Sequence, residues 1–512
     1  MANGFDGTDN VLLELPLTDE VSIGSSYETD SIEKANAYIL AHKDSVTAQY
    51  RQQYHASAPI GWINDPNGLC YFQGKYHMYC QYNPYDARWG LMHWGHWVSD
   101  DLISWEWKGV ALAPDSQADL GGCYSGTAIP VGDSLYLMYT GITWDAGKEI
   151  QQQCLAFSAD GFTFQKEKWN PVIPSALLPK GFSSSDFRDP KVYQEADGYR
   201  AVIAGQENDH GKFLLYSSHD LKNWLFESVL FDGHTRMIEC PDIFQINEKT
   251  ALLCGVIGRA DGVEYCPHER PVIMYLGTLS KDGSHFEQNT SLVVDYGADF
   301  YGPQTIRSHD GRRMMIGWMQ NWDRLMPTAY LSHGWNGCMS LPRELSIEEG
   351  VMYQRPVREI EDYRRSEYKY QIESIEGQGI EIPTASEVLL DIHGVDRELT
   401  VNLFENGDEA LRMTIDPQEG IMRTDSSHVG LSILMESDTE RQIISTPIRV
   451  LHGNLQLRVF LDACSAEVFV NQGEQVVSTR VFPRVPGLQK IRILSNNQHC
   501  SGTMTVYRLG KE

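Results

Sequence analysis

A motif that recurs about every 60 residues constrains the fold of this chain more than any other feature. The pattern Ser-x-Asp-(Leu/Gly)-x-x-(Trp/Phe) occurs four times, at residues 99–105, 158–164, 218–224 and 280–286. The starts lie 59, 60 and 62 residues apart, and each copy follows a strand-like run. One copy alone would be an ordinary turn. Four copies at near-constant spacing predict a β-propeller whose blades carry long loops.

The sequence around these motifs has the character of antiparallel sheets. From about residue 54, short runs rich in Tyr, Phe, Trp, Val and Ile alternate with Asp-Gly, Asn-Gly and Gly-Lys turns. This alternation is typical of β-hairpins. We therefore predict an all-β chain with a propeller over residues 54–345.

The regions on either side of the propeller differ in character. Residues 1–53 form an N-terminal extension, acidic and loosely ordered at first, with a helix predicted over residues 30–54 and capped by Ser31. The charged residues 346–372 are predicted to be a linker. Residues 373–512 contain a second set of alternating strands, which predict a C-terminal β-sandwich.

Length and charge exclude several classes of protein. A chain of 512 residues is too long for one ordinary core. Its net charge of −27 argues against binding to nucleic acid or to anionic membranes. No apolar run reaches the roughly 18 residues of a membrane span.

The chain also lacks the features of a secreted or metal-binding protein. The N-terminus does not resemble a signal peptide, although a trimmed chain would look the same. The ten cysteines form no close pair with metal-ligand spacing. We therefore expect reduced thiols, a cytoplasmic location and no metal.

Three acidic residues stand out because each lies in an aromatic, turn-rich segment next to a proline. Asp65 lies in Gly-Trp-Ile-Asn-Asp-Pro-Asn-Gly, Asp189 in Phe-Arg-Asp-Pro, and Glu239 in Ile-Glu-Cys-Pro-Asp. Proline fixes φ and lacks an N–H donor, so it can hold a strand rigidly outside the regular ladder. For any single Asp-Pro pair, however, an ordinary turn is the better interpretation.

The spacing of the polar residues strengthens the case for a site. Asp65, Ser125, Asp189, Glu239 and Tyr301 are 60, 64, 50 and 62 residues apart, close to the repeat period. Each blade would then place one of them at an equivalent depth, on its innermost strand. Equivalent points of a propeller converge on the central axis, so these residues are predicted to meet in one pocket.

Two carboxylates in an aromatic-walled pocket suit glycoside hydrolysis. The nucleophile must be ionised, and donors from Asn64 and Asn67 would lower the pKa of Asp65. The acid/base must start protonated, and apolar surroundings or a second carboxylate would raise the pKa of Glu239. Arg188 would keep Asp189 ionised and could also bind sugar hydroxyls.

Several ordered motifs make the chain resemble glycoside hydrolase family 32, which contains invertases, sucrose-6-phosphate hydrolases, inulinases, levanases and fructosyltransferases. They are WINDPNG (62–68), QYNP (81–84), YSG (124–126), FRDPKV (187–192), ECPD (239–242), DFYGPQT (299–305), IGWMQNW (316–322) and GWNGCMSLPREL (334–345). The resemblance runs from about residue 54 to the end. It implies a five-bladed propeller followed by a β-sandwich, and the N-terminal helix is similar to that of the intracellular bacterial members.

The resemblance also implies roles for individual residues. Asp65 would be the nucleophile, Glu239 the acid/base, and Asp189 the stabiliser of the transition state. The residues expected to bind substrate are Trp62, Asn64, Gln81, Trp89, Tyr124, Ser125, Arg188, Tyr301 and Trp322. No metal or organic cofactor is implied. Tyr124 and Gly302 depart from the common Phe and Ala, and neither departure is expected to touch the acids.

The expected reaction is retaining hydrolysis of terminal β-D-fructofuranosides through a fructosyl-enzyme. Sucrose, sucrose-6-phosphate and short fructooligosaccharides stay open as substrates, and so does the oligomeric state. A fructosyltransferase with the same catalytic residues is the alternative. A non-catalytic sugar-binding propeller is a third interpretation, against which the intact Asp65 and Glu239 argue.

Four other residues receive structural rather than chemical interpretations. His93 and His96 have a spacing that could bind metal, but no carboxylate or Cys completes a ligand set, so hydrogen bonding is expected. Trp318 is predicted to lie in the core, with Trp322 at the pocket rim. Cys240, although adjacent to Glu239, is expected to be a small packed hydrophobe.

Overall fold

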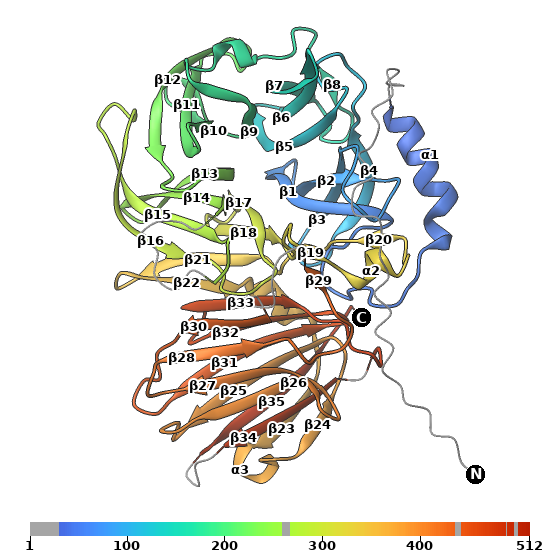
Figure 1. The fold of residues 1–512 in the computed structure, drawn as a ribbon, viewed down its shortest axis with the longest axis vertical. Coiled ribbons are helices and arrows are strands. Elements are labelled where there is room, and N and C mark those ends of the chain that lie inside the picture. Colours follow the sequence, from blue (N-terminus) through green and yellow to red (C-terminus); the bar gives the residue numbers. More distant parts are fainter. Residues whose placement is uncertain (1–29, 259–266, 436–441, 488, 496–499, 512) are drawn as a thin grey trace, which may run out of the picture.

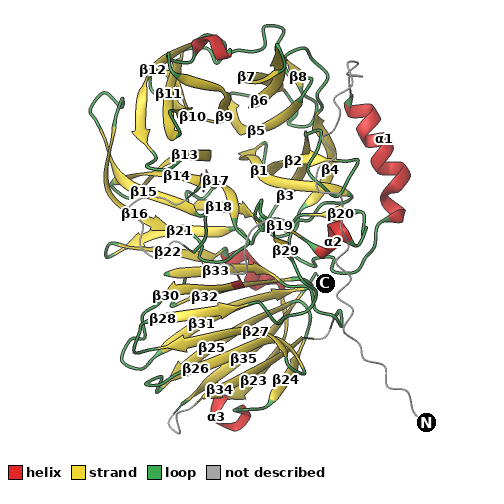
Figure 2. Ribbon diagram, in the orientation of Figure 1, coloured by secondary structure: helices red, strands yellow, loops and turns green. Residues whose placement is uncertain are grey.

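The computed structural model describes residues 30–511, apart from 259–266, 436–441, 488 and 496–499. The first 29 residues, predicted to be loosely ordered, lie outside this range. The described chain forms a propeller stacked on a β-sandwich, with one helix along the side of the propeller (Figure 1). Strands make up nearly all of the regular structure (Figure 2), which confirms the predicted all-β fold.

Five antiparallel sheets form the blades of the propeller. The innermost strands are β1 (Gly61–Phe72), β5 (Gly122–Val131), β9 (Phe182–Glu195), β13 (Met237–Ile246) and β17 (Tyr301–Arg307). The outer strands are β2 (Lys75–Asn83), β3 (His93–Ser99) and β4 (Glu106–Leu112) in blade one; β6 (Ser134–Asp145), β7 (Lys148–Ser158) and β8 (Gln165–Lys166) in blade two; β10 (Gly198–Glu207), β11 (His210–Ser218) and β12 (Trp224–Asp232) in blade three; β14 (Lys249–Ile257), β15 (Val272–Leu279) and β16 (Phe286–Val293) in blade four; and β18 (Arg313–Trp318), β21 (Arg343–Glu348) and β22 (Val351–Pro356) in blade five. Neighbouring innermost strands contact one another, and β17 contacts β1, so the ring closes.

The repeated Ser-x-Asp motif has one structural role in the first four blades. Each copy forms the turn between the third and fourth strands. In the second copy, the Ser158 hydroxyl donates to Asp160, whose carboxylate accepts the N–H groups of Phe162 and Thr163 at 2.8 Å. Asp101 and Asp220 make the same contacts in their blades. The motif is therefore a side-chain-capped turn that the blades share.

The C-terminal domain consists of two six-stranded antiparallel sheets. One sheet has the order β23 (Arg364–Gln371), β35 (Ser501–Leu509), β25 (Ser386–His393), β31 (Leu455–Asp462), β32 (Ser465–Val470) and β33 (Gln475–Arg480). The other has the order β24 (Gly379–Ile382), β34 (Gln489–Ser495), β26 (Leu399–Asn406), β27 (Glu409–Asp416), β28 (Ile421–Asp425) and β30 (Ile443–Pro447). Between them lies an aliphatic core that includes Val388, Leu411 and Val459.

The predicted linker over residues 346–372 is wrong. This segment holds the outermost strand of blade five, β22, and the first strand of the sandwich, β23. Only a short 3₁₀ helix, Arg358–Tyr363, connects them. The charged residues that indicated a connector lie partly in this 3₁₀ helix and partly on the edge strands β22 and β23, whose outward side chains face water.

The predicted helix over residues 30–54 is too long. Helix α1 spans Ile32–His42, with the Ser31 side chain accepting the Lys34 N–H as expected, and a 3₁₀ turn Lys43–Ser45 follows. Beyond it the chain bonds to the propeller, with the Thr47 N–H donating to the His333 carbonyl at 2.9 Å. Tyr50 has a φ of +65°, which no α-helix accommodates.

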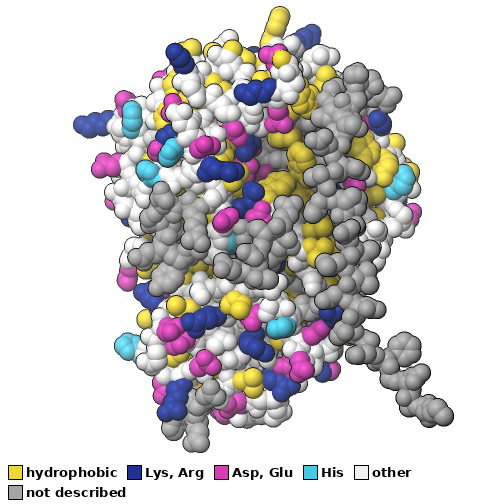
Figure 3. All heavy atoms as spheres, in the orientation of Figure 1, with side chains coloured by type: hydrophobic (Ala, Val, Ile, Leu, Met, Phe, Trp, Pro, Cys, Tyr) yellow, Lys and Arg dark blue, Asp and Glu magenta, His cyan; other side chains and the backbone are white. Residues whose placement is uncertain are grey.

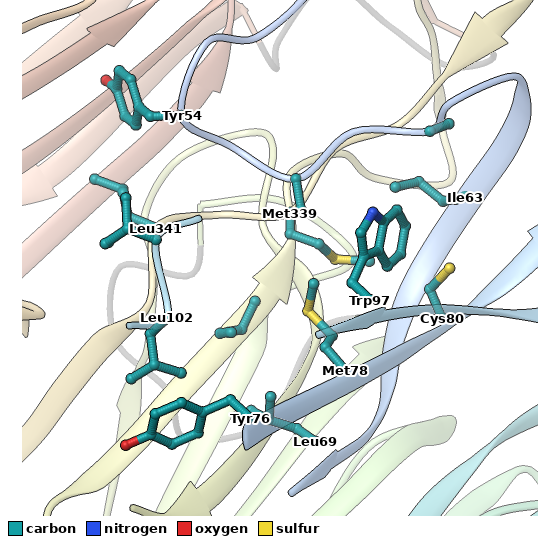
Figure 4. Packing of buried hydrophobic residues seen from close by; sticks show 14 of the residues in the cluster. Tyr54, Ile63, Leu69, Tyr76, Met78, Cys80, Trp97, Leu102, Met339 and Leu341 are labelled. Atoms are coloured by element: carbon teal, nitrogen blue, oxygen red, sulfur yellow. The ribbon is translucent and has the colours of Figure 1, made fainter. Parts of the chain in front are cut away.

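Short elements and one hydrophobic cluster complete the join between the domains. Strand β20 (Trp335–Asn336) pairs with β1, and β19 (Arg324–Leu325) pairs with β29 (Leu434–Met435) of the sandwich. Short helices are α2 (Pro327–Tyr330), α3 (Ile372–Ile375) and the 3₁₀ turn Ser175–Leu177. The cluster extends from Trp97 and Ile63 of blade one to Tyr54 and Leu341 beside the sandwich (Figure 4). Among the described residues, no helix has the length and apolarity to cross a membrane.

Candidate active site

A β-bulge interrupts every innermost strand of the propeller at its polar residue. The register with the second strand shifts between Ile63 and Pro66 in β1 and between Tyr124 and Gly126 in β5. Equivalent shifts lie at residues 188–191 in β9, 239–242 in β13 and 301–304 in β17. Bulges re-aim side chains and leave backbone groups outside the ladder. Four of the five contain or adjoin a proline, which needs no ladder partner.

Asp65 lies on the bulge of β1 and is buried. Its Oδ2 accepts hydrogen bonds from the Ser125 hydroxyl at 2.7 Å and from the Gln81 amide at 3.2 Å. The Cys240 thiol lies 3.5 Å from the same oxygen. The other oxygen, Oδ1, is buried without a hydrogen-bond partner among the described residues. One oxygen of this carboxylate is thus held by its neighbours, and the other is buried without a hydrogen-bond partner among the described residues.

Gly302 lies against that second oxygen. Its φ is +52°, and a Cβ at this position would lie 2.6 Å from Asp65 Oδ1. The expectation that this departure does not touch the acids is therefore wrong. The bulge in β17 brings the residue after Tyr301 against Asp65 of the neighbouring strand β1, which the sequence does not reveal.

Asp189 and Cys240 both have left-handed backbone, with φ of 62° and 49°. The Asp189 N–H donates to the Thr140 hydroxyl at 2.9 Å, and the Cys240 N–H donates to Asp189 Oδ2 at 2.8 Å. Strained positions of this kind are maintained by their surroundings and cluster at functional sites. The contacts tie blades two, three and four together beneath the carboxylates.

Glu239 is the most accessible of the three acids. Arg188 Nη2 donates to its Oε1 at 2.9 Å, and the Tyr301 hydroxyl donates to its Oε2 at 2.7 Å. The apolar surroundings predicted for Glu239 are thus wrong for the carboxylate itself, because its neighbours Ile238 and Cys240 pack toward Gly233 and Asp65 instead. A cation and a phenol hold this group from two sides.

Burial dominates the acidity of the other two acids. It raises the pKa of Asp65 to about 6, with the Ser125 donor opposing and the Glu239 charge adding to the effect. It raises the pKa of Asp189 to about 7, although the Arg188 charge opposes it. The expectation of a lowered pKa for Asp65 is therefore wrong, because desolvation outweighs the nearby donors. For Asp189, which Arg188 was expected to keep ionised, desolvation likewise outweighs the opposing Arg188 charge.

The acids open into a cavity of about 340 Å³ at the axis of the propeller. In the space-filling view, acidic and basic side chains gather with a hydrophobic wall in a hollow of this half of the molecule (Figure 3). The predicted site residues that line the cavity are Asp65, Gln81, Trp89, Tyr124, Arg188, Asp189, Glu239 and Trp322. The other predicted residues lie one layer behind it: Trp62, Asn64, Ser125 and Tyr301.

This second layer supports the lining. The Trp62 indole donates to Asn64 Oδ1 at 2.8 Å, and its ring lies 6.3 Å from that of Trp322. Trp89, 46% exposed, meets Tyr124 edge-on at the mouth. Trp318 is fully buried, as predicted for a core residue.

Three lining residues were not predicted: Gln151, Ser185 and Asp186. Asp186 and Ser185 precede the Phe-Arg-Asp-Pro motif directly, so their position in the chain was the available signal. Gln151, on β7, accepts the Phe187 N–H at 2.9 Å, and nothing in its local sequence marks it.

The two histidines considered as metal ligands make other contacts. His93 Nε2 lies 3.2 Å from Asp30, and its Nδ1 lies 3.0 Å from the Leu91 carbonyl. His96 contacts His77 at 3.0 Å. In the part of the chain that the structure describes, no cluster of three or more His, Cys, Asp or Glu side chains is arranged for a metal ion.

Comparison with known protein families shows to which family this chain belongs. Residues 55–356 match "Glycosyl hydrolases family 32 N-terminal domain", and residues 359–508 match "Glycosyl hydrolases family 32 C terminal". The chain belongs to glycosyl hydrolase family 32. The two matches correspond closely to the propeller and the sandwich, and they show that this family 32 chain is a glycoside hydrolase acting on fructosides.

Individual relatives cover most of this family 32 chain. A sucrose-6-phosphate hydrolase of Escherichia coli is 35% identical over 465 residues, which are 84% of this chain and 89% of the relative. A raffinose invertase of Escherichia coli is 36% identical, covering 85% and 90%. A variant of the Bombyx mori family 32 beta-fructofuranosidase in complex with sucrose superposes with a TM-score of 0.82 at 33% identity, covering 94% and 98%.

Proposed function

We propose that the cavity carries out retaining hydrolysis of terminal β-D-fructofuranosides by double displacement. The observation that carries this proposal is the pairing of two different carboxyl groups in one cavity. Asp65 keeps one oxygen unpartnered, whereas Glu239 is held on both oxygens by Arg188 and Tyr301. One group is poised to bond to carbon and the other to exchange a proton, as retention requires.

In the first step an Asp65 oxygen attacks the anomeric carbon of the fructosyl unit. The bond from that carbon to the leaving oxygen breaks, and Glu239 gives its proton to that oxygen. The product is an ester between Asp65 and the fructosyl group. Asp189, which lines the same cavity, is placed to hold fructosyl hydroxyls as positive charge develops.

In the second step Glu239, now a carboxylate, takes a proton from water. The resulting hydroxide attacks the anomeric carbon, and the ester bond to Asp65 breaks. Arg188 and Tyr301 stabilise the carboxylate form of Glu239 between the steps through their hydrogen bonds. Two inversions leave the configuration retained.

The walls of the cavity favour an uncharged leaving sugar. Arg188 is the one cation among the described lining residues, and its guanidinium already bonds Asp186 and Glu239. The Asp186 carboxylate is partly exposed and would repel a phosphate dianion. The names of the relatives include both an invertase and sucrose-6-phosphate hydrolases, so we propose sucrose as the substrate of this chain.

The test compares kcat/KM on sucrose, sucrose-6-phosphate, 1-kestose and inulin. We expect sucrose to be preferred over its phosphate, and Asp186→Asn to narrow that gap by improving the phosphorylated substrate. A parent enzyme that prefers sucrose-6-phosphate would contradict the substrate assignment. Kestose-type oligosaccharides as the main products at high sucrose would instead identify a fructosyltransferase. The cytoplasmic location and any homo-oligomer stay predictions.

A further inference from the structure

A short segment of the propeller lies on the edge of the sandwich immediately before Tyr301. The Tyr296 N–H donates to the Val476 carbonyl at 2.8 Å, and the Asp299 N–H donates to the Ser478 carbonyl at 3.1 Å. A Cβ on Gly297 would lie 1.9 Å from the Ser478 carbonyl oxygen. Residues 295–299 form no strand of their own, but they lie directly against the edge strand β33, and Gly297 approaches it at a distance that leaves no room for a Cβ.

Two buried carboxylates fix this segment to β33. Asp299 Oδ2 accepts the Arg480 N–H at 2.7 Å, and its Oδ1 lies 2.8 Å from Arg324 Nε. Asp295 accepts the N–H of Ser478 at 2.9 Å and its hydroxyl at 2.8 Å. Both carboxylates are almost fully buried, so water competes little for these bonds.

The segment leads directly into the proposed acid/base. Tyr301 begins β17 two residues after Asp299, and its hydroxyl donates to Glu239 Oε2 at 2.7 Å. The Tyr301 ring packs against Gly255, where a Cβ would lie 2.6 Å from the ring. With the ring confined by β14, the height of the hydroxyl depends on where the backbone of residues 299–301 is held.

A second connection reaches the rim of the cavity. Arg324, the ion-pair partner of Asp299, lies two residues after Trp322, which lines the cavity. The Arg480 side chain extends toward the Met319 carbonyl of the same propeller segment. The contacts of Asp299 with Arg480 and Arg324 thus hold the chain both just before Tyr301 and just after Trp322.

We propose that Asp299 is a positioning residue, which fixes Tyr301 and through it the orientation of Glu239. The sandwich is then part of the catalytic architecture, because β33 supplies the surface on which Asp299 is held. This inference rests on the proposed role of Glu239. Asp299 itself is fully buried and does not line the cavity.

The experiment compares Asp299→Asn with a matched variant, Glu387→Gln. Glu387 is an equally buried carboxylate of the sandwich, paired with Arg364 at 2.6 Å and Arg458 at 2.7 Å, and it is not among the described residues that line the cavity. Misplacing a catalytic group by about 1 Å can slow a reaction about 100-fold, so we expect a 10- to roughly 100-fold loss of kcat on sucrose for Asp299→Asn. The KM of Asp299→Asn should change little. Glu387→Gln should keep the parent kcat, although its melting temperature should be comparable to that of Asp299→Asn.

A double-mutant cycle separates positioning from general destabilisation. Tyr301→Phe removes the hydrogen bond directly, and adding Asp299→Asn to it should cost little further kcat. The alkaline limb of the pH profile of kcat should move in the same direction in Asp299→Asn as in Tyr301→Phe. The charged and titratable groups around Glu239 are otherwise the same in each: Arg188, Asp189, Asp65 and Cys240.

Additive losses in the cycle, or an Asp299→Asn enzyme with parent kcat, would overturn the inference. If Asp299→Asn does not fold, Arg324→Gln breaks the same ion pair from the other side and should give the same kcat loss. A fully active Glu239→Gln would instead overturn the proposed function. The two failures are therefore distinguishable.

Discussion

The cavity and the domain interface both bury carboxylates, but they satisfy them differently. At the interface, Arg343 Nη2 lies 2.8 Å from Asp295 and 3.0 Å from Glu467, and His55 bridges Asp462 and Glu467 at 2.8 and 3.0 Å. In the cavity, four acids face a single cation among the described lining residues, Arg188, which forms ion pairs with Asp186, Asp189 and Glu239. Buried carboxylates with full partners specify how elements pack, whereas under-compensated ones are primed to bind protons or carbon.

Acidity follows the same division. Glu467 is fully buried, yet His55 and Arg343 outweigh burial and hold its pKa below its usual value. Asp65 is as deeply buried and has its pKa raised to about 6. Asp295 is an intermediate case, since burial raises its pKa despite Arg343. The number of cations and donors, rather than depth alone, separates a structural carboxylate from a reactive one.

The largest effect is expected when the carboxyl group that transfers the proton in the cavity is replaced. Glu239→Gln keeps the shape of the side chain, and its amide oxygen can still accept a hydrogen bond from Arg188, but the amide cannot transfer a proton to or from the substrate or water. General acid–base catalysis contributes about 10²–10⁴-fold, so kcat on sucrose should fall by that factor. The melting temperature should stay near that of the parent, because this carboxylate is partly exposed. A variant with parent kcat would contradict the assignment.

At the interface the corresponding change should affect stability rather than chemistry. Arg343→Met leaves Asp295 and Glu467 without their shared cation. Breaking a buried pair from one side costs about 3–5 kcal/mol, so the free energy of unfolding should drop by that amount in denaturant titrations. A loss no larger than that of an exposed ion pair would show that the network is not balanced as described.

The pH dependence of stability sharpens the comparison further. Burial lowers the pKa of His55, but Asp462 and Glu467 outweigh it and raise the pKa to about 9 from an ordinary 6.5. His55 should therefore stabilise the fold fully below about pH 6.5, and this contribution should be lost as the pH rises through about 9. Melting temperatures measured across that window should fall in the parent. The part of the slope due to His55 should be absent in His55→Gln; an unchanged slope would exclude this role.

The smallest expected effect concerns one donor in the cavity. The Ser125 hydroxyl lowers the pKa of Asp65, so Ser125→Ala should raise that pKa further. Asp65 must be ionised to attack. In the parent the acidic limb of kcat/KM should therefore lie near pH 6, the raised pKa of Asp65, and in Ser125→Ala it should move to higher pH. Since the three carboxyls interact, the limb reports the group as a whole. Movement to lower pH would contradict the sign of this donor's effect.

The repeat period predicted the arrangement of the site because it reports blade geometry directly. Asp65, Ser125, Asp189, Glu239 and Tyr301 all lie on bulges of innermost strands. The predictions that were wrong or incomplete concern properties that depend on residues distant in the sequence.

Those failures have separate physical causes. The acidity of Asp65 depends on desolvation by residues distant in the chain, and Gln151 reaches the cavity through the pairing of another blade. The charged run after residue 346 predicts a linker although it forms edge strands and a short 3₁₀ helix, because exposed regular elements and connectors are equally polar. The dependence of Tyr301 on β33 involves contacts about 180 residues apart, which no local pattern encodes.

The most direct test of the account is to trap the bond between Asp65 and the sugar. Glu239→Gln would be incubated with a fructosyl fluoride, whose leaving group needs no proton, and its peptides would be mapped by mass spectrometry. We predict that the peptide containing Asp65 gains one fructosyl group, because the variant lacks the base that activates water for release. Fluoride release without any adduct on Asp65, or an adduct on another residue, would contradict it.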